Sequence, residues 1–231
     1  MRIIYKLIFL NLLQLALFNL SDINSIANNY ISELRDINIQ SDRMRFRHNM
    51  ERVGQILAFE LSKALEYKDQ EVQTPLGTSV IPLLQNSPVI VTIMRAGVPF
   101  FQGFIDVFDK SDAGFIGAYR TPMDSSNHFN IDMNYMTSVS LEEKELIIVD
   151  PMLATGKSII KAIEQIITFG NPSRIHIVSL IAAREGYQYV KDNMDDTTMF
   201  WVGVIDEELN DKSYIVPGLG DAGDLCYGEK V

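Results

Sequence analysis

The sequence predicts an α/β fold with a mostly parallel central sheet flanked by helices. From residue 89 onward, short runs rich in β-branched residues alternate with helical segments, which argues for parallel strands joined by crossover helices. The runs are apolar almost throughout, as Leu146 to Val149 shows, and such runs are typical of strands that helices cover on both faces. A chain of 231 residues suits one domain of this kind.

Helices are expected before the first of these strands. Apolar residues recur at intervals of three and four from Ile23 to Leu34, as one face of a helix requires. A second face with the same spacing runs from Phe46 to Leu65, and Ser41 is placed to cap the helix that carries it. The sequence therefore predicts two N-terminal helices packed on the domain.

The extreme N-terminus is a separate feature. We expect residues 1–20 to form an N-terminal apolar extension and residues 21–231 to form a single domain. Arg2 and Lys6 precede the apolar run, as in an export signal, but polar amides interrupt it. It is also shorter than the roughly 20 uninterrupted apolar residues of a membrane span. We therefore expect no stable membrane association, and either a helix packed on the domain or an extension from a misplaced start codon.

Strand-like and helix-like patterns of apolar residues alternate along the rest of the chain and define the remaining elements. We expect strands at 89–94, 115–120, 145–150, 174–182 and 199–206, and helices at 97–108, 156–169 and 184–193. The polar stretch around Pro75 and Gly77 is assigned neither helix nor strand. Residues 121–140 are polar, Met-rich and weakly periodic, which predicts a loop or flap over the ligand-binding edge of the sheet. In this fold class, that edge lies at the carboxyl ends of the strands.

Charge and cysteine content argue against several function classes. The net charge is −10, so binding to nucleic acid has no electrostatic support. Cys226 is the only cysteine, which rules out an internal disulfide and favours a reducing, cytoplasmic compartment. It is expected to be a core or surface residue and not a nucleophile. The three histidines lack metal-ligand spacing, and His176, inside an apolar strand, is expected to be a buried core residue.

The segment DPMLATGKS, from Asp150 to Ser158, ends like a nucleotide-triphosphate P-loop. The P-loop pattern needs a glycine five positions before its second glycine. That position is Pro151, which has a fixed φ and no N–H to offer a phosphate. The sequence therefore argues against a kinase or NTPase.

The same segment suits a single phosphate beside a sugar. Thr155 can cap the helix that follows, Gly156 lets a ligand approach the backbone, and the first-turn N–H groups carry the positive end of the helix dipole. Asp150, at the end of the strand, is placed to accept hydrogen bonds from sugar hydroxyls. The pattern indicates a ribose 5-phosphate site, while a capped turn without a ligand is the alternative.

Four segments in order resemble the uracil phosphoribosyltransferase family of type I phosphoribosyltransferases. VDPMLATG (149–156) is similar to the family's phosphoribosyl-diphosphate loop, and IDEELNDKSYIVPGLGDAGD (205–224) is similar to its uracil-binding signature. IMRAGVPFFQG (93–103) and GAYR (117–120) fall where the family carries two diphosphate-binding arginines. The resemblance runs from about Ser21 to the C-terminus. It implies the type I phosphoribosyltransferase fold, with a small hood or flap and N-terminal helices.

The resemblance implies pyrimidine salvage, in which uracil and 5-phospho-α-D-ribose 1-diphosphate (PRPP) give UMP and diphosphate. The implied catalytic residues are Arg120, Asp150 and Asp221. Two forked cations suit the diphosphate. The implied PRPP-binding residues are Arg95, Arg120, Asp150, Pro151, Met152, Leu153, Ala154, Thr155, Gly156, Lys157, Ser158 and Asp221, and the implied uracil-binding residues are Ile215, Gly220, Asp221 and Ala222.

The glycine-rich run 217–223 also suits a flat base on physical grounds. It is too rich in glycine for the interior of a helix or strand, and small residues let backbone groups reach the edge of a ring. Uracil presents alternating carbonyl and N–H groups, whereas the amino group of cytosine would leave buried donors unpaired. A glycine-rich surface loop is the alternative.

The resemblance also implies a cofactor and an assembly. Mg²⁺ is expected, held mainly by the substrate's own oxygens and by water and not by a set of protein ligands. A homodimer or higher homo-oligomer is expected. The other function compatible with this fold is a non-catalytic, pyrimidine-sensing regulator. The net negative charge and the uracil-binding signature both argue against it.

Lys157 departs from the family pattern, which has a second glycine at this position. A cation in the first turn of a helix lies beside the positive end of the dipole, which is unfavourable unless an anion is bound there. If the position requires a positive φ, a lysine would be strained. Because the other motif positions are intact, we expect activity to be retained.

Overall fold

The computed structural model describes residues 16–120 and 131–229, with the side chains of residues 119–120 and 131–134 excepted. Within these ranges, the sheet has the order β1-β10-β9-β7-β4-β5-β6, and β8 pairs with β9. Every pair is parallel except β5 with β6. The strands are β1 (Leu17–Asn19), β4 (Val89–Met94), β5 (Asp112–Arg120), β6 (Ile131–Thr137), β7 (Glu145–Val149), β8 (Met152–Leu153), β9 (Arg174–Ala183) and β10 (Met199–Asp206).

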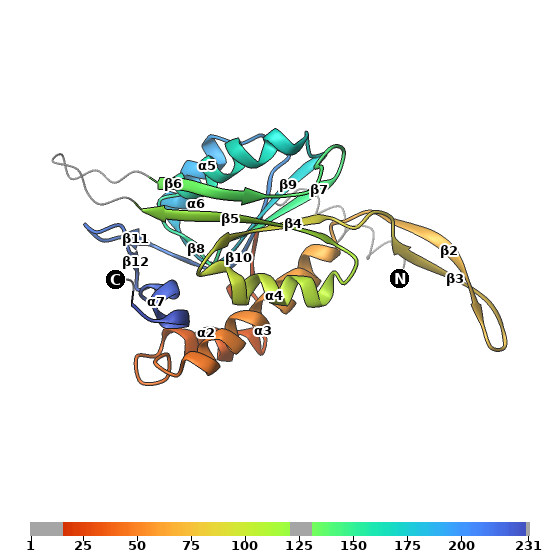
Figure 1. Cartoon of the computed structure of the whole chain (residues 1–231). Helices are drawn as coiled ribbons and strands as arrows, with labels where there is room; N and C mark the ends of the chain where they lie inside the picture. The colour runs from red at the N-terminus through yellow and green to blue at the C-terminus, as the bar shows by residue number, and fades with distance from the viewer. Residues whose placement is uncertain (1–15, 121–130, 230–231) are drawn as a thin grey trace.

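Helices cover both faces of this sheet, as Figure 1 shows. Alternate residues of β7 divide between two cores: Ile147 and Val149 join one, and Leu146 and Ile148 join the other. The first core contains α2 (Ala27–Arg35), α3 (Arg43–Ser62), α4 (Gly97–Val107) and α7 (Ala222–Tyr227), and the second contains α5 (Lys157–Ile166) and α6 (Arg184–Asp192). The predicted α/β fold with a mostly parallel sheet is confirmed.

β1 and β6 lie where no strand was predicted. β1 falls within the apolar extension and pairs with the edge of β10, so the sheet includes residues from before position 21. β6 lies in the predicted flap, and its residues pair antiparallel with β5. Of the predicted loop or flap, residues 131–137 form a strand and not a loop, and residues 121–130 lie outside the described part of the chain.

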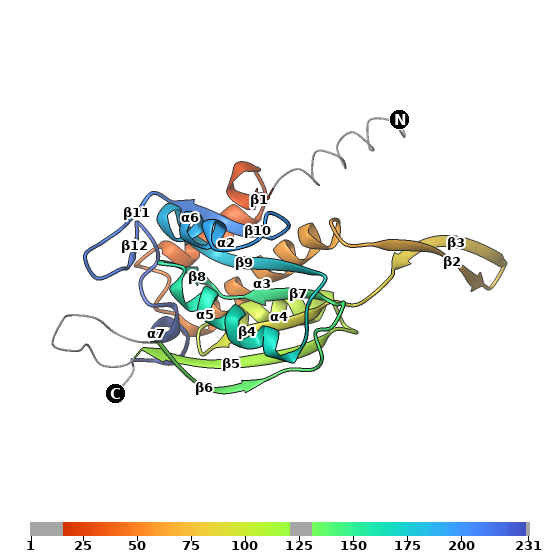
Figure 2. The ribbon, with the colours of Figure 1, turned by 90° about the horizontal axis from the view of Figure 1, so that it is seen from above.

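The polar stretch around Pro75 and Gly77 forms a long hairpin of two strands, β2 (Tyr67–Thr74) and β3 (Gly77–Leu84). Figures 1 and 2 show that it projects from the body, at the opposite end of the molecule from β11 and β12. Both of its faces meet solvent, so its strands lack the alternation of apolar and polar residues that a half-buried strand shows. Apolar side chains are nevertheless exposed on it: Tyr67, Leu76, Val80, Ile81 and Leu83.

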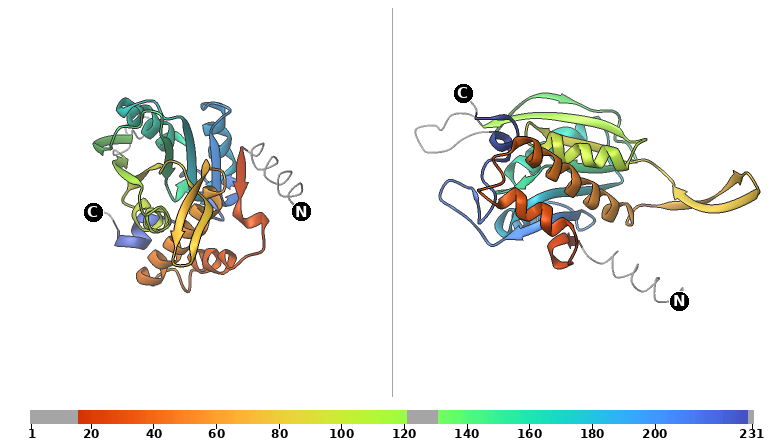
Figure 3. Two further views of the ribbon diagram at one scale, coloured as in Figure 1. Left: turned by 90° about the vertical axis from the view of Figure 1, so that its right-hand side faces the viewer. Right: turned by 90° about the horizontal axis from the view of Figure 1, so that it is seen from below.

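Helix α3 is capped one residue later than predicted. The side chain of Asp42, and not that of Ser41, accepts hydrogen bonds from the backbone N–H groups of Met44 and Arg45. Figure 3 shows α2 and α3 side by side on one face of the molecule, as their contacts require. Among the described residues, no helix is both long and apolar enough to cross a membrane.

His176 is a core residue with two partners, as predicted. The indole N–H of Trp201 donates to its Nδ1 at 3.1 Å, and its Nε2 lies 2.5 Å from a carboxylate oxygen of Glu145. Because the indole can only donate, Nε2 carries the ring proton and donates to Glu145. Burial raises the pKa of Glu145, but the hydrogen bond from His176 and the charge of Arg174 outweigh it and hold that pKa below its usual value. The network lies at the amino-terminal ends of the strands and has no part in the cavity at their other ends.

Candidate active site

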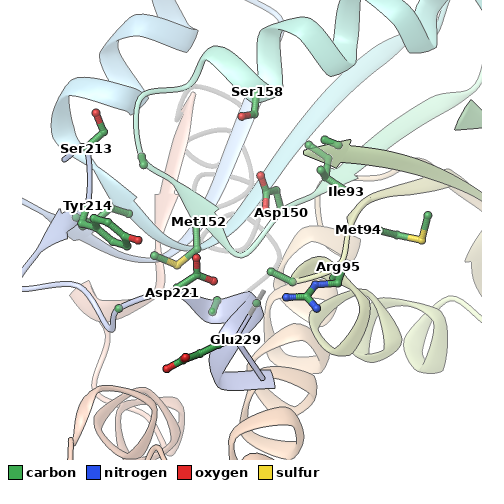
Figure 4. Close-up of a pocket in the computed structure, with 17 residues that line it drawn as sticks. Ile93, Met94, Arg95, Asp150, Met152, Ser158, Ser213, Tyr214, Asp221 and Glu229 are labelled. Atoms are coloured by element: carbon green, nitrogen blue, oxygen red, sulfur yellow. The ribbon is translucent and has the colours of Figure 1, made fainter. Parts of the chain in front are cut away.

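A cavity of about 590 Å³ opens beside the carboxyl ends of β4 and β7. Three segments distant in the sequence meet there, and Figure 4 shows Arg95, Asp150 and Asp221 arranged around it. The cavity is lined by Ile93, Met94, Arg95, Ala96, Ala118, Asp150, Met152, Ala154, Ser158, Ser213, Tyr214, Ile215, Gly220, Asp221, Ala222, Gly223 and Glu229. Its position agrees with the ligand edge that a parallel sheet provides.

The turn between β7 and α5 presents a helix N-terminus beside this cavity. Helix α5 begins at Lys157, and the hydroxyl of Thr155 accepts a hydrogen bond from the Lys157 N–H at 3.4 Å. Ser158, in the first turn, lines the cavity with Asp150 and Ala154. First-turn N–H groups and the positive end of the helix dipole favour an anion, so the geometry suits a phosphate.

Gly156 is required by the backbone and the packing of this turn. It has φ +78° and stands at the N-cap of α5. A Cβ there would lie 2.5 Å from Cγ2 of Val190 and 2.9 Å from the carbonyl oxygen of Gly186, both on α6. The side of Gly156 on which a side chain would stand is thus filled by α6, so the packing of the turn requires glycine here.

Lys157 carries no backbone strain. The positive φ of the turn falls on Gly156, and Lys157 is the first residue of α5 with a helical backbone. Its side chain is exposed and does not line the cavity. The departure from the family pattern is thus tolerated by the fold, and its effect is confined to charge near the helix N-terminus.

The C-terminal loop forms the other wall. Strands β11 (Glu208–Leu209) and β12 (Ile215–Val216) make a small antiparallel hairpin, and the loop continues through a cis peptide bond between Val216 and Pro217. Gly218 and Gly220 have φ values of +56° and +93°, which favour glycine. Ile215, Gly220 and Ala222 line the cavity, and so present one wall built largely from small residues and backbone.

A buried carboxylate holds this loop in place. Asp206, at the end of β10, is 6% exposed, and its two oxygens accept hydrogen bonds at 2.9 Å from Nη2 of Arg35 and from the backbone N–H of Gly218. Gln40 adds to this anchor, because its amide donates to the carbonyl oxygens of Leu34 and Leu219. Helix α2 and the turn after it thus support the glycine-rich loop 217–223, called the base loop from here on.

Helix α7 closes the site and is itself anchored. Asp221 caps it by accepting a hydrogen bond from the backbone N–H of Asp224 at 3.0 Å. The guanidinium of Arg47 donates to the carbonyl oxygen of Cys226 at 2.8 Å. Burial raises the pKa of the Cys226 thiol to about 12, so the thiol stays protonated at neutral pH. Cys226 is a core residue, as expected, and not a nucleophile.

The structure brings most of the predicted site residues together. Nine line the cavity, namely Arg95, Asp150, Met152, Ala154, Ser158, Ile215, Gly220, Asp221 and Ala222. Five others do not line it and lie in the same segment, from the end of β7 to the first residue of α5, namely Pro151, Leu153, Thr155, Gly156 and Lys157. The backbone of Arg120 ends β5, while its side chain lies outside the described part of the chain.

Several lining residues were not predicted. Ser213, with φ +61°, and Tyr214 belong to a tight turn in which the side chain of Asn210 accepts hydrogen bonds from two backbone N–H groups. Glu229 adds a third carboxylate beside those of Asp150 and Asp221. The turn residues carry an Asn-Asp-Lys-Ser signal that predicts a turn, but no local pattern indicates that the turn faces the cavity.

We predict that Asp206→Ala destabilises the fold and the base loop together. The change removes a buried ionic hydrogen bond and leaves the Gly218 N–H without its acceptor, which should cost about 2 to 3 kcal/mol of unfolding free energy. Urea unfolding measures this loss, and the KM for the base should rise in the same variant. The matched control is Glu207→Ala, because Glu207 pairs with Arg184 in a fully exposed ion pair. An equal loss of stability in both variants would contradict the anchoring role.

Comparisons with known proteins agree with this site. The family model for uracil phosphoribosyltransferase matches residues 23–229. A uracil phosphoribosyltransferase of Porphyromonas gingivalis is 46% identical over 208 residues, covering 90% of this chain and 96% of the relative. One from Pyrococcus furiosus is 36% identical over 204 residues, covering 87% of this chain and 85% of the relative.

A solved structure gives the same result for the fold. The AQ2163 protein from Aquifex aeolicus is 29% identical and superposes with a TM-score of 0.81, covering 93% of this chain and 99% of that one. The match to the family model covers both the phosphate turn and the glycine-rich loop that line the cavity. The chain belongs to the uracil phosphoribosyltransferase family.

Proposed function

We propose that the protein joins uracil to PRPP, giving UMP and diphosphate, with the residues of the cavity as its active site. One observation carries this proposal: a phosphate-binding turn, an arginine and a glycine-rich loop, distant in the sequence, line a single cavity. Its volume of about 590 Å³ lies within the range of about 300 to 1,000 Å³ typical of small-molecule sites.

Each part of PRPP binds to groups of the site that suit its charge and hydrogen bonds. The 5-phosphate binds the first turn of α5, where backbone N–H groups and Ser158 meet it. Asp150 accepts hydrogen bonds from the ribose hydroxyls. Arg95 and Arg120 bind the diphosphate through forked N–H groups, which suit phosphate oxygens.

The base binds the loop that Asp206 anchors. Ile215 packs on the ring, and the backbone at Gly220, Asp221 and Ala222 meets its edge. Backbone groups at fixed positions distinguish a carbonyl from an amino group, because the wrong partner leaves a buried donor unpaired. This arrangement favours uracil over cytosine.

Mg²⁺ completes the proposal. Within the two described ranges, no cluster of three or more His, Cys, Asp or Glu side chains is arranged to hold a metal by itself. Carboxylates of Asp150, Asp221 and Glu229 do line the cavity, and hard oxygen donors of this kind suit Mg²⁺ through its water shell. The ion, when bound with the substrate, neutralises the charge that builds on the diphosphate.

The chemistry then needs alignment more than proton transfer. A bond forms between N1 of uracil and C1 of the ribose while the bond from C1 to the diphosphate oxygen breaks. Diphosphate leaves with the electron pair, and the proton of N1 passes to water. Arg95 and Arg120 stabilise that leaving group, and the carboxylates of Asp150 and Asp221 favour the positive charge that develops on the sugar. The flap at 121–140, of which 121–130 lie outside the described residues, is proposed to exclude water.

The exposed β2–β3 hairpin supports a homo-oligomer. A two-stranded ribbon is marginally stable in water by itself. This one exposes 62% of Val80 and all of Leu76. A second copy of the chain would cover these apolar side chains and the unpaired edges of the ribbon. We retain a dimer or higher oligomer as the assembly, a cytoplasmic location, and a single domain as parts of the proposal, with the domain extended to include β1 before residue 21.

The decisive assay uses Mg²⁺, PRPP and one base at a time. We expect UMP from uracil and no nucleotide from cytosine, hypoxanthine or orotate, because the base loop reads the edge of the ring through fixed backbone groups. Product analysis after a single turnover measures this directly. No product from any base with folded protein would contradict the proposal and would favour a pyrimidine-sensing regulator on the same fold.

Lys157 should assist the binding of PRPP without taking part in the chemistry. Lys157→Gln keeps the helix but removes a cation beside the 5-phosphate, so we expect the KM for PRPP to rise about threefold while kcat stays unchanged. The KM of the wild-type protein should also rise more steeply with salt. Lys110→Ala, an exposed lysine after α4, is the charge-matched control. A fall in kcat at unchanged KM would show that Lys157 acts in another way.

The hairpin proposal predicts a change of assembly. Val80→Lys with Ile81→Lys puts charges on the apolar surface of the hairpin, and we expect a monomer where the wild-type protein elutes at twice the mass of the chain or more. Light scattering after size exclusion measures the mass. Thr78→Lys, on the same hairpin and also exposed, adds a charge without removing an apolar residue and should leave the assembly intact. A wild-type monomer would refute the assignment.

A further inference from the structure

Arg95 is held by the C-terminal helix. Its Nη2 lies 3.4 Å from Oδ1 of Asp224 and 3.4 Å from the carbonyl oxygen of Gly228. The side chain of Arg95 keeps 44% of its surface exposed, and it lines the cavity beside Asp221 (Figure 4). Two acceptors from one segment therefore fix one nitrogen of a side chain that is otherwise open to the cavity.

The remaining donors of Arg95 stay available. Both acceptors use Nη2, and in the part of the chain that the structure describes, Nε and Nη1 make no hydrogen bond to the protein. Arginine side chains carry large rotamer freedom, which is lost when they bind a phosphate. A guanidinium already held at Nη2 has lost part of that freedom before the substrate arrives.

The same helix links this arginine to the base loop. The backbone N–H of Asp224 donates to Oδ1 of Asp221, so one residue contacts both Asp221 and Arg95. Gly223 lies between them: a Cβ there would stand 3.1 Å from Oδ1 of Asp221 and 3.9 Å from Nη2 of Arg95. The base loop and the diphosphate arginine thus meet at Asp224.

We propose that Asp224 is a positioning residue, whose carboxylate holds Arg95 in the orientation that binds the diphosphate of PRPP. The inference rests on the proposed function and assigns a role to a residue that the sequence did not single out. Asp224 touches neither base nor sugar in this account. It acts through Arg95 and shares its helix with Asp221, so that both groups are placed together.

Whether the removal of Asp224 weakens or tightens PRPP binding distinguishes a positioning role from simple electrostatic repulsion. Asp224 is an anion close to a site for an anionic substrate, so charge alone predicts that its removal tightens PRPP binding. Loss of a positioning residue predicts the opposite, because Arg95 must then be ordered at the cost of binding free energy. The ion pair partly neutralises Asp224, which weakens its repulsion of the substrate and leaves the positioning effect dominant.

The test measures binding and turnover in Asp224→Ala. We expect the KM for PRPP, and the Kd for inorganic diphosphate with Mg²⁺ by calorimetry, to rise about tenfold, equivalent to about 1.4 kcal/mol. We expect kcat to change less than about threefold. Asp224→Asn keeps an acceptor for Nη2 and should restore most of the affinity. Asp109→Ala removes an exposed carboxylate after α4 and should leave both constants unchanged.

A double variant separates positioning from a general disturbance of the fold. In an Arg95→Ala background, Asp224→Ala should add nothing to the Kd for diphosphate, because the group it positions is absent. If Asp224→Ala does not fold, Asp224→Ser is too short to reach Arg95 and gives the same test. Unchanged or tighter binding in the Ala or Ser variant, or an equal loss in the Arg95→Ala background, overturns the inference. Failure of the wild-type protein to form UMP contradicts the proposed function instead, and diphosphate binding still tests Asp224.

Discussion

The geometry of the site depends on one buried carboxylate. Asp206 ends β10 inside the protein, where an unpaired charge would be costly, and it is satisfied by a guanidinium from α2 and by the backbone N–H of Gly218. The two partners come from opposite ends of the chain. The ion pair therefore joins the N-terminal helices, the sheet and the base loop at one point. The loop has too few side chains of its own to make a core, so its shape depends on this external support.

An acidic protein that binds a highly charged anion must concentrate its few favourable charges. The chain has a net charge of −10, and three carboxylates line the cavity together with Arg95. In the proposed complex, the helix N-terminus of α5 and the guanidinium of Arg95 would meet the phosphates at separate places. Asp150 and Asp221 would then face the sugar, where positive charge develops in the proposed reaction. The cationic and anionic groups of the site would thus face different parts of the same substrate.

Elements with their own periodicity could be predicted from the sequence. The five apolar strands and the helices between them follow from local patterns, as does the phosphate turn, because strand, turn chemistry and helix cap lie within a few residues. Strand β1 is three residues long, and both faces of the β2–β3 hairpin meet solvent, so neither produces a periodic signal. Strand β6 depends on pairing with β5, which local composition does not encode.

The contacts that position the site could not be predicted from the sequence, because their partners are far apart in the chain. Arg35 and Asp206 are 171 residues apart, and Arg95 and Asp224 are 129 apart, so no spacing rule connects them. The predicted roles of Arg95 and Asp221 came from resemblance, and that of Asp150 came first from its place at the end of a strand. Their convergence on one cavity is a property of the fold.

The most direct test of the account is a crystal structure of the protein with UMP, diphosphate and Mg²⁺. It should place the 5-phosphate on the first turn of α5, the base against Gly220 to Ala222, and the diphosphate on the guanidinium of Arg95. Asp224 should still contact Nη2 of that arginine. A nucleotide bound elsewhere, or a base turned away from the loop that Asp206 anchors, would contradict the central claim.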